Sequence, residues 1–285
     1  MKKRILILGA SGMAGHVIYL YLKETGNYSI SNAVYRHRLN AESIIIDVTN
    51  SNLVETLILE QQPDIIINCI GILIKGSTAS PDNAIFINAY FPHLLKRLAD
   101  IIGAKIIHIS TDCVFSGKKG AYTENDFRDA DDIYGRSKAL GELINSRDLT
   151  IRTSIIGPEL KQDGEGLFHW FMSQKSEING YTEAYWGGVT TLELAKAIDK
   201  VITDNEIGLV HLTNGAKITK FELLRLLGVI WNKEGIIIKP YKEKSIDKSL
   251  LQLTSSSFNV PSYSKMLLEL REWMLNNQDV YNVLY

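Results

Sequence analysis

The stretch Arg4-Ile5-Leu6-Ile7-Leu8-Gly9-Ala10-Ser11-Gly12-Met13-Ala14-Gly15 decides the fold that we predict for this chain. Its apolar beginning predicts a buried β-strand, and the helical periodicity from Gly15 to Thr25 predicts a helix directly after the turn. Gly9 permits a tight turn, Gly12 lets the backbone approach a pyrophosphate, and Gly15 allows the helix to pack closely on the strand. The N–H groups at the start of such a helix face the phosphates of a dinucleotide. We therefore expect a cofactor-binding turn made of Gly9, Ser11, Gly12, Met13 and Gly15.

Short apolar runs and helical stretches alternate through the first half of the chain. The predicted strands are Arg4 to Leu8, Ser29 to Tyr35, Ser43 to Ile46, Asp64 to Ile70, Lys105 to Ser110 and Leu149 to Thr153. The predicted helices are Gly15 to Thr25, Asn50 to Gln61, Asn83 to Ile102 and Tyr134 to Ser146. Nearly all-apolar strands suit a parallel sheet that is covered on both faces. The pattern predicts an α/β fold, a Rossmann-type doubly wound parallel sheet that binds ligands at the carboxyl ends of its strands.

The rhythm changes after Gly157-Pro158, where residues 159–188 are rich in glycine and aromatic residues without a clean period. A helix from Thr191 to Thr203, a strand from Leu209 to Leu212 and a helix from Lys220 to Ile230 follow, and a polar tail from Lys239 to Val260 precedes a last helix, Ser262 to Leu275. We expect a dinucleotide-binding domain over residues 1–157, to which 189–215 return. A smaller, irregular α/β substrate lobe would comprise residues 158–188 and 216–285.

Composition excludes several classes of protein. The chain has 285 residues, 45% of them hydrophobic, and a net charge of −1. Nucleic acid or an anionic membrane as the main partner would demand a clustered basic surface. The apolar runs are too short to span a bilayer. Two cysteines, Cys69 and Cys113, occur in or beside apolar runs and are expected to be reduced, as in a cytoplasmic protein. A homodimer is left open.

Tyr134 and Lys138 are candidate catalytic residues. In a helix, residues at i and i+4 share a face, so the ammonium would lie beside the phenol and make it a better proton donor. Carbonyl reduction needs that chemistry. A Tyr-x-x-x-Lys pattern alone is more often a solvated helix face. Here Ser110-Thr111-Asp112 ends a predicted strand shortly before it, and the glycine turn ends the first strand, so three features point to one redox site.

The residues after the second strand distinguish between NAD and NADP. An acid in that place accepts hydrogen bonds from the ribose 2′-hydroxyl of NAD, but residues 29–41 contain no Asp or Glu. Arg36 and Arg38 follow instead, and guanidinium groups bind a 2′-phosphate well. An exposed basic loop is the alternative. We expect NADPH as the cofactor, with NADH also accepted.

The motifs together resemble those of a known family. The Gly-x-x-Gly-x-x-Gly turn is similar to that of the extended short-chain dehydrogenase/reductases, and Ile109-Ser110-Thr111-Asp112-Cys113-Val114-Phe115-Ser116-Gly117 resembles a segment of the dTDP-4-dehydrorhamnose reductases. Arg152-Thr153-Ser154, Thr191-Leu192-Glu193-Leu194-Ala195 and Val210-His211-Leu212-Thr213-Asn214 continue the likeness. It covers nearly the whole chain and is weakest at 159–182 and after 235.

The resemblance implies a role for each matching residue. Thr111 would hydrogen-bond the substrate carbonyl and Tyr134 would protonate the forming alkoxide. Lys138 would hold the nicotinamide ribose and lower the pKa of Tyr134. The resemblance also implies cofactor contacts by Asp47, Cys69, Ile70 and Gly71, and substrate contacts by Thr111, Asp112, Cys113, Tyr134, Ile155 and Trp186. Hydride would come from the nicotinamide, so no metal is required. The implied activity is NADPH-dependent reduction of a nucleotide-linked 4-keto-6-deoxyhexose, for deoxysugar and surface polysaccharide precursors.

Two departures from that family concern the sugar. Where those reductases carry Tyr after Ser-Thr-Asp and Trp after Arg-Thr-Ser, this chain has Cys113 and Ile155. Smaller side chains leave space for a bulkier group, such as the 2-acetamido group of a UDP-linked 4-keto-6-deoxyhexose. Trp170 or Trp186 would fill the same space if either reached it. The identity of the nucleotide, dTDP or UDP, stays open.

Three other activities are weighed against the reductase. A sugar-nucleotide 4,6-dehydratase needs an Asp-Glu pair after the catalytic threonine, but Asp112 is followed by Cys113. A C4 epimerase shares the Thr, Tyr and Lys, yet normally has an acid after the second strand to hold NAD. A dinucleotide-binding regulatory subunit, such as the β subunit of methionine adenosyltransferase, also resembles the reductases. An intact set of Thr111, Tyr134 and Lys138 favours catalysis over that role.

Overall fold

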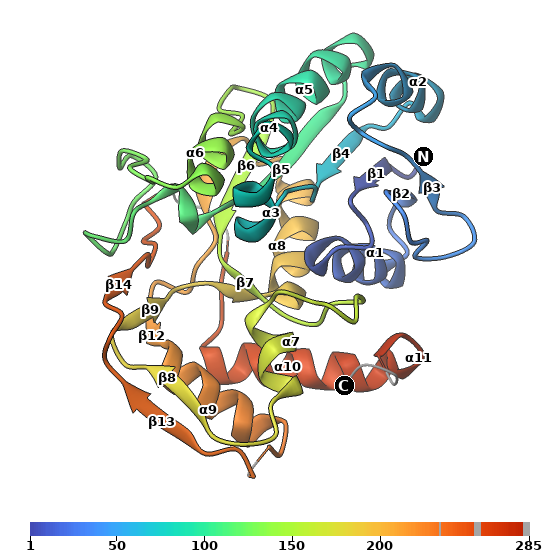
Figure 1. The fold of residues 1–285 in the computed structure, drawn as a ribbon. Coiled ribbons are helices and arrows are strands. Elements are labelled where there is room, and N and C mark those ends of the chain that lie inside the picture. Colours follow the sequence, from blue (N-terminus) through green and yellow to red (C-terminus); the bar gives the residue numbers. More distant parts are fainter. Residues whose placement is uncertain (234, 254–257, 282–285) are drawn as a thin grey trace.

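A seven-stranded parallel sheet forms the centre of the protein (Figure 1). The structure is a computed structural model that describes residues 1–233, 235–253 and 258–281. The strands lie in the order β11-β6-β5-β4-β1-β2-β3. Their bounds are β1 Arg4–Leu8, β2 Ser29–Val34, β3 Ile44–Ile45, β4 Ile65–Asn68, β5 Lys105–Thr111, β6 Leu149–Thr153 and β11 Gly208–His211. The doubly wound parallel sheet predicted from the sequence is confirmed, and its strand order reverses between β1 and β4.

Side chains of β1 alternate between two apolar cores because successive residues of a strand point to opposite faces. Ile5 and Ile7 belong to the core that the second lobe shares, whereas Leu6 and Leu8 belong to the core on the other face. Helices α1 (Met13–Thr25) and α8 (Thr191–Asp204) pack together on the first face. Helices α2 (Ser51–Gln61) and α5 (Phe91–Ile102) cover the second, as Figure 1 shows. Both faces of the sheet are therefore buried.

The chain returns to this sheet after the lobe has begun. Strand β11 pairs in parallel with β6, with His211 opposite Arg152, and extends the sheet by one strand at that edge. Helix α8 precedes it and is capped by Thr190, whose hydroxyl accepts a hydrogen bond from the Glu193 amide at 3.2 Å. The predicted return of residues 189–215 to the sheet is thus seen in β11 and α8, while the exact domain boundaries stay a prediction.

Helix α6 (Ile133–Leu140) carries Tyr134 and Lys138 and is shorter than the sequence suggests. The prediction that it continues to Ser146 is wrong. At Gly141 the chain passes so close to a neighbouring segment that an added Cβ would lie 1.9 Å from the carbonyl oxygen of Asn88. Beyond it, the Leu143 amide donates to the hydroxyl of Thr150 at 3.0 Å. These contacts with other elements end the helix, and Gly141 is the local signal for its end.

The predicted single helix from Asn83 to Ile102 is also divided. Pro81–Ala84 forms α4, Ile85–Tyr90 forms the π-helical turn η1, and α5 continues from Phe91; the short helix α3 (Ile74–Ala79) precedes them. The π-helical turn contains the fully buried Asn88. Its amide accepts from the Ile72 N–H at 2.8 Å and donates to the Ser137 hydroxyl at 3.1 Å. This one side chain therefore connects the segment after β4 with helix α6.

The second lobe is built from short strands around three helices. Helices α7 (Leu167–Ser173), α9 (Lys220–Ile230) and α10 (Tyr263–Asn276) lie at the opposite end of the molecule from α2 and α5 (Figure 1). The strands are β7 Ile155–Ile156, β8 Ile178–Tyr181, β9 Ala184–Trp186, β10 Val189–Thr190, β12 Ile218–Thr219, β13 Ile238–Tyr241 and β14 Ile246–Asp247, and the last helix is α11 Gln278–Tyr281. The strands β13 and β14 fall in the predicted polar tail, part of which, 254–257, lies outside the described residues.

Two contacts fasten this lobe to the glycine turn. The buried ring of His16 on α1 donates from Nδ1 to the Gly12 carbonyl at 2.7 Å, and its Nε2 meets the hydroxyl of Tyr281 at 2.8 Å. The Gly166 amide donates to Glu159 Oε1 at 2.6 Å and so holds the 159–166 loop. An added Cβ at Gly166 would lie 2.4 Å from the methyl carbon of Met13, so this loop lies against the turn.

Candidate active site

A cleft of about 670 Å³ opens between the carboxyl edge of the sheet and the second lobe. The sheet side contributes the glycine turn and the segments after β4, β5 and β6. The lobe side contributes the 159–165 loop. Of the predicted site residues, Ser11, Gly12, Met13, Cys69, Ile70, Gly71, Thr111, Asp112, Cys113, Tyr134, Lys138 and Ile155 line the cleft. The structure thus brings most of the predicted cofactor and substrate residues to one place.

The glycine turn has the geometry that its sequence requires. Gly9 has a φ of +78°, a left-handed conformation that favours glycine. A Cβ on Gly15 would lie 2.3 Å from the Gly9 carbonyl oxygen, so helix α1 can approach β1 only with glycine there. The first turn of α1 has no side-chain cap and no acidic residue. Its free N–H groups and positive dipole end therefore open onto the cleft and suit an anion.

The basic residues after β2 lie outside the cleft. Arg36 and Arg38 are both exposed. The guanidinium of Arg36 stacks over the Tyr35 ring at 4.8 Å, and that of Arg38 donates to the Ser43 carbonyl. Asp47 accepts from the amide and hydroxyl of Thr49 at 3.0 and 2.7 Å, and these bonds lower the pKa of its carboxyl. Asp47 is thus a turn residue in the cofactor-free chain, and its adenine contact stays a prediction.

The end of β5 presents three polar residues to the cleft. The hydroxyl of Thr111 donates to Asp112 Oδ1 at 3.1 Å and accepts from the Cys113 amide, also at 3.1 Å. Burial raises the pKa of Asp112, although the positive charge of Lys248 opposes it. Burial also raises the pKa of the Cys113 thiol to about 12. Cys113 is therefore a thiol rather than a thiolate, and both cysteines are free.

Tyr134 lies in the first turn of α6, which Asp132 caps by accepting from the Gly135 amide at 2.7 Å. Burial raises the pKa of the phenol well above its usual value, and a hydrogen bond with Thr111 acts in the opposite direction. The shift is thus upward, contrary to the lowering expected from Lys138. Desolvation of the phenolate and the negative charges of Asp112 and Asp132 act together and outweigh the Thr111 hydrogen bond.

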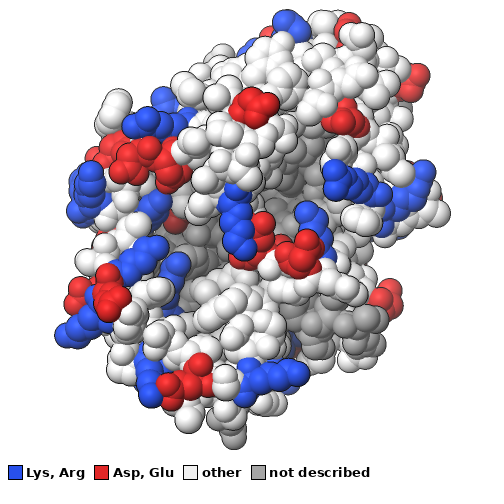
Figure 2. All heavy atoms as spheres, in the orientation of Figure 1, with Lys and Arg blue, Asp and Glu red and all other residues white. Residues whose placement is uncertain are grey.

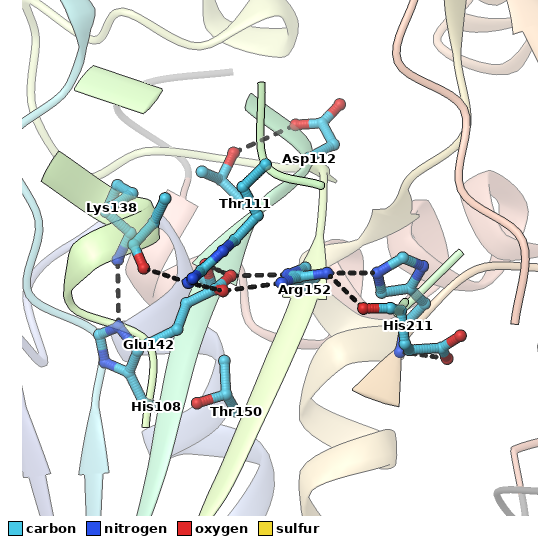
Figure 3. Close-up of polar contacts among 12 residues, drawn as sticks. His108, Thr111, Asp112, Lys138, Glu142, Thr150, Arg152 and His211 are labelled. Carbon is cyan, nitrogen blue, oxygen red and sulfur yellow. Dashed lines mark hydrogen bonds and ion pairs between the residues drawn. The ribbon is translucent and has the colours of Figure 1, made fainter. Parts of the chain in front are cut away.

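Lys138 is almost completely buried at the base of the cleft. Its amine donates to the Ile109 carbonyl at 2.8 Å and meets Nε2 of His108 at 3.5 Å (Figure 3). Burial lowers the pKa of this amine to about 8, against the attraction of Glu142 and Cys69. A lysine of this kind exchanges its proton close to physiological pH, as catalytic lysines do.

Ile155 and Trp186, both predicted to contact the substrate, differ in their position relative to the cleft. Ile155 lines the cleft, whereas Trp186 is absent from the lining formed by the described residues and is only 8% exposed. Its indole N–H donates to the Ser154 hydroxyl at 2.9 Å, and its ring packs against Tyr263 with centroids 5.5 Å apart. Trp170, on α7, does not line the described part of the cleft either. The predicted substrate contact of Trp186 is therefore not seen.

Comparison with known proteins identifies the family of this chain. The family model described as the RmlD substrate binding domain matches residues 2–285. The chain belongs to this family. It is 32% identical over 141 residues to methionine adenosyltransferase 2 subunit beta of Rattus norvegicus, a match over 49% of this chain and only 42% of that protein.

Two solved structures have the same fold. A hypothetical dTDP-4-dehydrorhamnose reductase from Sulfolobus tokodaii has a TM-score of 0.78 and 26% identity, covering 91% of this chain and 98% of the other. The dTDP-4-dehydrorhamnose reductase from Bacillus anthracis in complex with NADP has a TM-score of 0.84 and 23% identity, covering 95% and 99%.

In this member of the RmlD family, a buried ion pair contacts strand β5, which ends at Thr111. Arg152 on β6 makes two bonds to the carboxylate of Glu142, at 2.7 and 2.8 Å, and Glu142 also accepts from the Ser110 hydroxyl at 2.8 Å. Figure 3 shows that the network continues from Arg152 to His211 on β11. The sequence prediction missed Glu142 because it expected that residue within a helix. The only signal was Arg152, the one charged residue inside the predicted strand Leu149 to Thr153.

The sequence prediction also missed the lobe's loop and two buried polar residues of the sheet. Glu159, Leu160, Lys161, Asp163 and Glu165 line the cleft from a segment without a clean period. Asn68 and His108 lie fully buried in β4 and β5 behind Lys138. Polar residues in the middle of apolar strands were the available signal. Within the described residues, no group of three or more His, Cys, Asp or Glu is placed to hold a metal ion. None of the helices described is long and apolar enough to cross a membrane.

Proposed function

We propose that this protein is an NADPH-dependent reductase of a nucleotide-linked 4-keto-6-deoxyhexose, with dTDP-4-dehydrorhamnose as the first candidate substrate. One observation carries the proposal: Thr111, Tyr134 and Lys138 line the same cleft as the uncapped start of α1. A proton donor and a dinucleotide-binding turn therefore share one enclosed volume. The reductase named in the NADP complex has the same fold, which supports this reading.

The residues present fit a dinucleotide. Gly9 and Gly15 leave room for a close turn, and the N–H groups of α1 would hold the pyrophosphate. Ile70 and Gly71 would lie along the adenine-side ribose, and Lys138 would hold the nicotinamide ribose. Arg36, exposed and close enough to Asp47 for its charge to lower the pKa of that carboxyl, would bind the 2′-phosphate after leaving the Tyr35 ring. When bound, the nicotinamide supplies a hydride to the carbonyl carbon.

The side chains of this protein then account for the rest of the reaction. Thr111 would donate a hydrogen bond to the carbonyl oxygen after turning from Asp112. Hydride addition breaks the C=O π bond and leaves negative charge on that oxygen. Tyr134 would give its proton to the oxygen and yield the alcohol, and the Lys138 ammonium would stabilise the phenolate that remains. The raised pKa of Tyr134 keeps this phenol protonated until the alkoxide forms, as a general acid requires.

Lysines of the second lobe favour a substrate that carries a diphosphate. Lys248 is hydrogen-bonded with Cys113, and Lys220 is close enough to Asp112 and Cys113 for their charges to affect it. Burial lowers the pKa of Lys220, and repulsion from Lys244 and Lys248 acts in the same direction. An anion bound beside several lysines reduces the repulsion between their positive charges. Figure 2 shows basic side chains around the hollowed middle of this face.

The sugar pocket favours a second candidate substrate. Cys113 and Ile155 line the cleft, and neither Trp170 nor Trp186 belongs to its described lining. Space beside the sugar is compatible with a 2-acetamido-4-keto-6-deoxyhexose carried on UDP. The free thiols of Cys69 and Cys113 support a reducing compartment such as the cytoplasm.

The test is NADPH oxidation by the purified protein with a panel of dTDP- and UDP-linked 4-keto-6-deoxyhexoses, with and without a 2-acetamido group. Turnover of at least one sugar is expected, and Lys220→Gln should raise its KM with little change in kcat. An absence of turnover across the panel, with NADPH binding intact in calorimetry, would overturn the reductase. That outcome would favour a regulatory subunit, as the likeness to methionine adenosyltransferase 2 subunit beta suggests.

A further inference from the structure

A chain of hydrogen bonds runs from the backbone after β4 to the amine of Lys138. The Ile70 amide donates to Asn68 Oδ1 at 3.1 Å. The Nδ2 atom of Asn68 lies 3.1 Å from Nδ1 of His108, and Nε2 of His108 lies 3.5 Å from Nζ of Lys138. Asn68 and His108 are completely buried. The last contact, between His108 on β5 and Lys138 on α6, is drawn in Figure 3.

The direction of this chain is fixed at its first member. A backbone N–H can only donate, so the Asn68 atom that faces Ile70 must be the carbonyl oxygen. The Asn68 atom that faces His108 is then the NH₂ group, which donates to Nδ1. A neutral imidazole with an accepting Nδ1 carries its proton on Nε2. His108 therefore points an N–H at Lys138.

An N–H directed at Lys138 distinguishes the two protonation states of the amine. A neutral amine accepts the His108 hydrogen and still donates to the Ile109 carbonyl. An ammonium has only donors, so its hydrogen would face the Nε2 hydrogen across 3.5 Å. We propose that His108, oriented by Asn68, is a positioning residue that favours the neutral amine of Lys138 and so makes its proton easy to lose and to regain.

The charged groups around His108 and Lys138 are compatible with a neutral amine on Lys138. Glu142, from the segment after α6, and Cys69, from the segment after β4, both favour the ammonium, yet burial still lowers the pKa of Lys138 to about 8. Burial holds the pKa of His108 far below its usual value, and the charges of Lys138 and of His93 on α5 act in the same direction. His108 is thus neutral over the physiological range and has a defined tautomer.

The consequence for the reaction rests on the proposed function. Ribose hydroxyls beside Lys138 would give an ammonium new acceptors, and a Tyr134 phenolate would give it an opposite charge. Lys138 would then take up a proton as the site fills and release it as the site empties. Burial brings the pKa of Lys138 to about 8, where an ordinary lysine stays charged, and the His108 N–H would favour the neutral amine further.

The first experiment measures the tautomer of His108 in the cofactor-free protein. Two-bond ¹⁵N–¹H correlation spectra distinguish the Nε2–H form from the Nδ1–H form, and a His108→Gln variant assigns the signal among the six histidines. The Nε2–H form is expected at pH 7. The Nδ1–H form would overturn the proposal, whether or not any variant folds, because the wild-type protein supplies the spectrum.

The second experiment reverses the chain with an isosteric substitution. In Asn68→Asp a carboxylate keeps the bond to Ile70 but must accept from Nδ1, which leaves Nε2 as an acceptor for the Lys138 ammonium. The pKa of Lys138, followed by ¹³Cε titration without cofactor, should rise by about one pH unit or more.

His108→Leu, alone and combined with Asn68→Asp, separates the hydrogen-bond chain from simple charge attraction. We expect less than half of the rise to survive without the imidazole. A rise of the same size in the double variant would show that the carboxylate acts through space and would refute the role of His108. These titrations use no substrate, so a failure of the proposed reductase would leave them unaffected.

Discussion

The two sides of the cleft are constructed in different ways. On the sheet side, cleft residues lie at or just beyond the carboxyl ends of parallel strands, such as Ser11 after β1, Cys69 after β4 and Thr111 at the end of β5, and helix α6 adds Tyr134 and Lys138. On the lobe side, Glu159 and Lys161 line the cleft from a loop. Lys220 and Lys248 follow two-residue strands and lie near Asp112 without lining the cleft. A parallel sheet places strand ends at one edge, so local pattern determines position. In the lobe, no regular sheet relates the local sequence pattern to the position of a residue.

The difference also separates two kinds of chemistry. The sheet side has Tyr134, a half-buried phenol whose pKa is raised by desolvation, and a helix start suited to phosphates. The lobe side has charged side chains that range from the buried Glu159 to the exposed Lys161. We infer that the sheet side supplies the reaction and the lobe side supplies specificity. Substitutions on the two sides should therefore affect kcat and KM differently.

The largest expected effect is on the sheet side. Tyr134→Phe removes the proton donor and preserves the shape of the ring, so kcat should fall by about 100-fold or more while NADPH binding is retained. Steady-state kinetics on the best keto-sugar of the panel and calorimetry of NADPH binding measure the two quantities. Full activity in Tyr134→Phe would show that another residue is the acid. It would contradict the inference that this side of the cleft supplies the reaction.

The second effect concerns the junction between the two sides, where His16 meets Tyr281. Burial lowers the pKa of His16 to about 4 from 6.5, with a weaker opposing contribution from the Gly12 carbonyl. The unfolded chain binds a proton as the pH falls below 6.5, whereas the folded chain does so only near 4. Stability from this group is therefore complete above pH 6.5 and is lost between those values.

At pH 5 the loss from His16 should be about 2 kcal/mol relative to pH 7.5. Urea denaturation of the wild type and of His16→Gln at both pH values measures it. The buried His108 and His211 also have lowered pKa values, so the wild type should lose more in total. The difference between the two proteins isolates His16. If both lose the same free energy, His16 is protonated in the folded state and the junction is not buried as described.

The sequence predicted the sheet side of the cleft better than the lobe side. The i, i+4 spacing of Tyr134 and Lys138 and the glycine spacing at Gly9 and Gly15 are local, and the structure places Tyr134 and Lys138 in the cleft beside that turn. The end of the strand near Thr111 could be predicted from an apolar run followed by polar residues. Periodicity and turn chemistry therefore sufficed for the sheet side of the site.

Tertiary contacts decided the features that the sequence did not predict. Helix α6 ends at Leu140 because of the Asn88 carbonyl, and Trp186 turns away from the cleft because Ser154 and Tyr263 hold its ring. The direction in which His108 donates depends on an amide after another strand. Each of these depends on residues distant in the sequence, and apart from Gly141 no local pattern indicates them.

The third effect returns to the sheet side, at the two arginines after β2. Arg38 is already bonded to the Ser43 carbonyl, whereas Arg36 stacks on Tyr35 and attracts Asp47 without a direct ion pair, so it can turn towards a 2′-phosphate. Arg36→Ala should weaken NADPH binding by about 20-fold and leave NADH binding nearly unchanged. Arg38→Ala is the matched control and should affect NADPH less. Equal affinity of the wild type for NADPH and NADH in calorimetry would contradict the assignment of the phosphate to these residues.

The smallest expected effect is on the wall that lies between the two sides. Ile155 borders the cleft where related reductases have a Trp, and Trp186 is held behind Ser154, so the space beside Ile155 is available to the sugar. Ile155→Trp should fill it and shift the ratio of kcat/KM towards dTDP-4-dehydrorhamnose, and away from a 2-acetamido sugar on UDP, by about 10-fold. Val189→Ile, on the neighbouring strand β10 and fully buried, is a control for altered packing of the same wall. An unchanged ratio in Ile155→Trp would mean that the sugar does not contact this wall, and the lobe side alone would then have to supply the specificity.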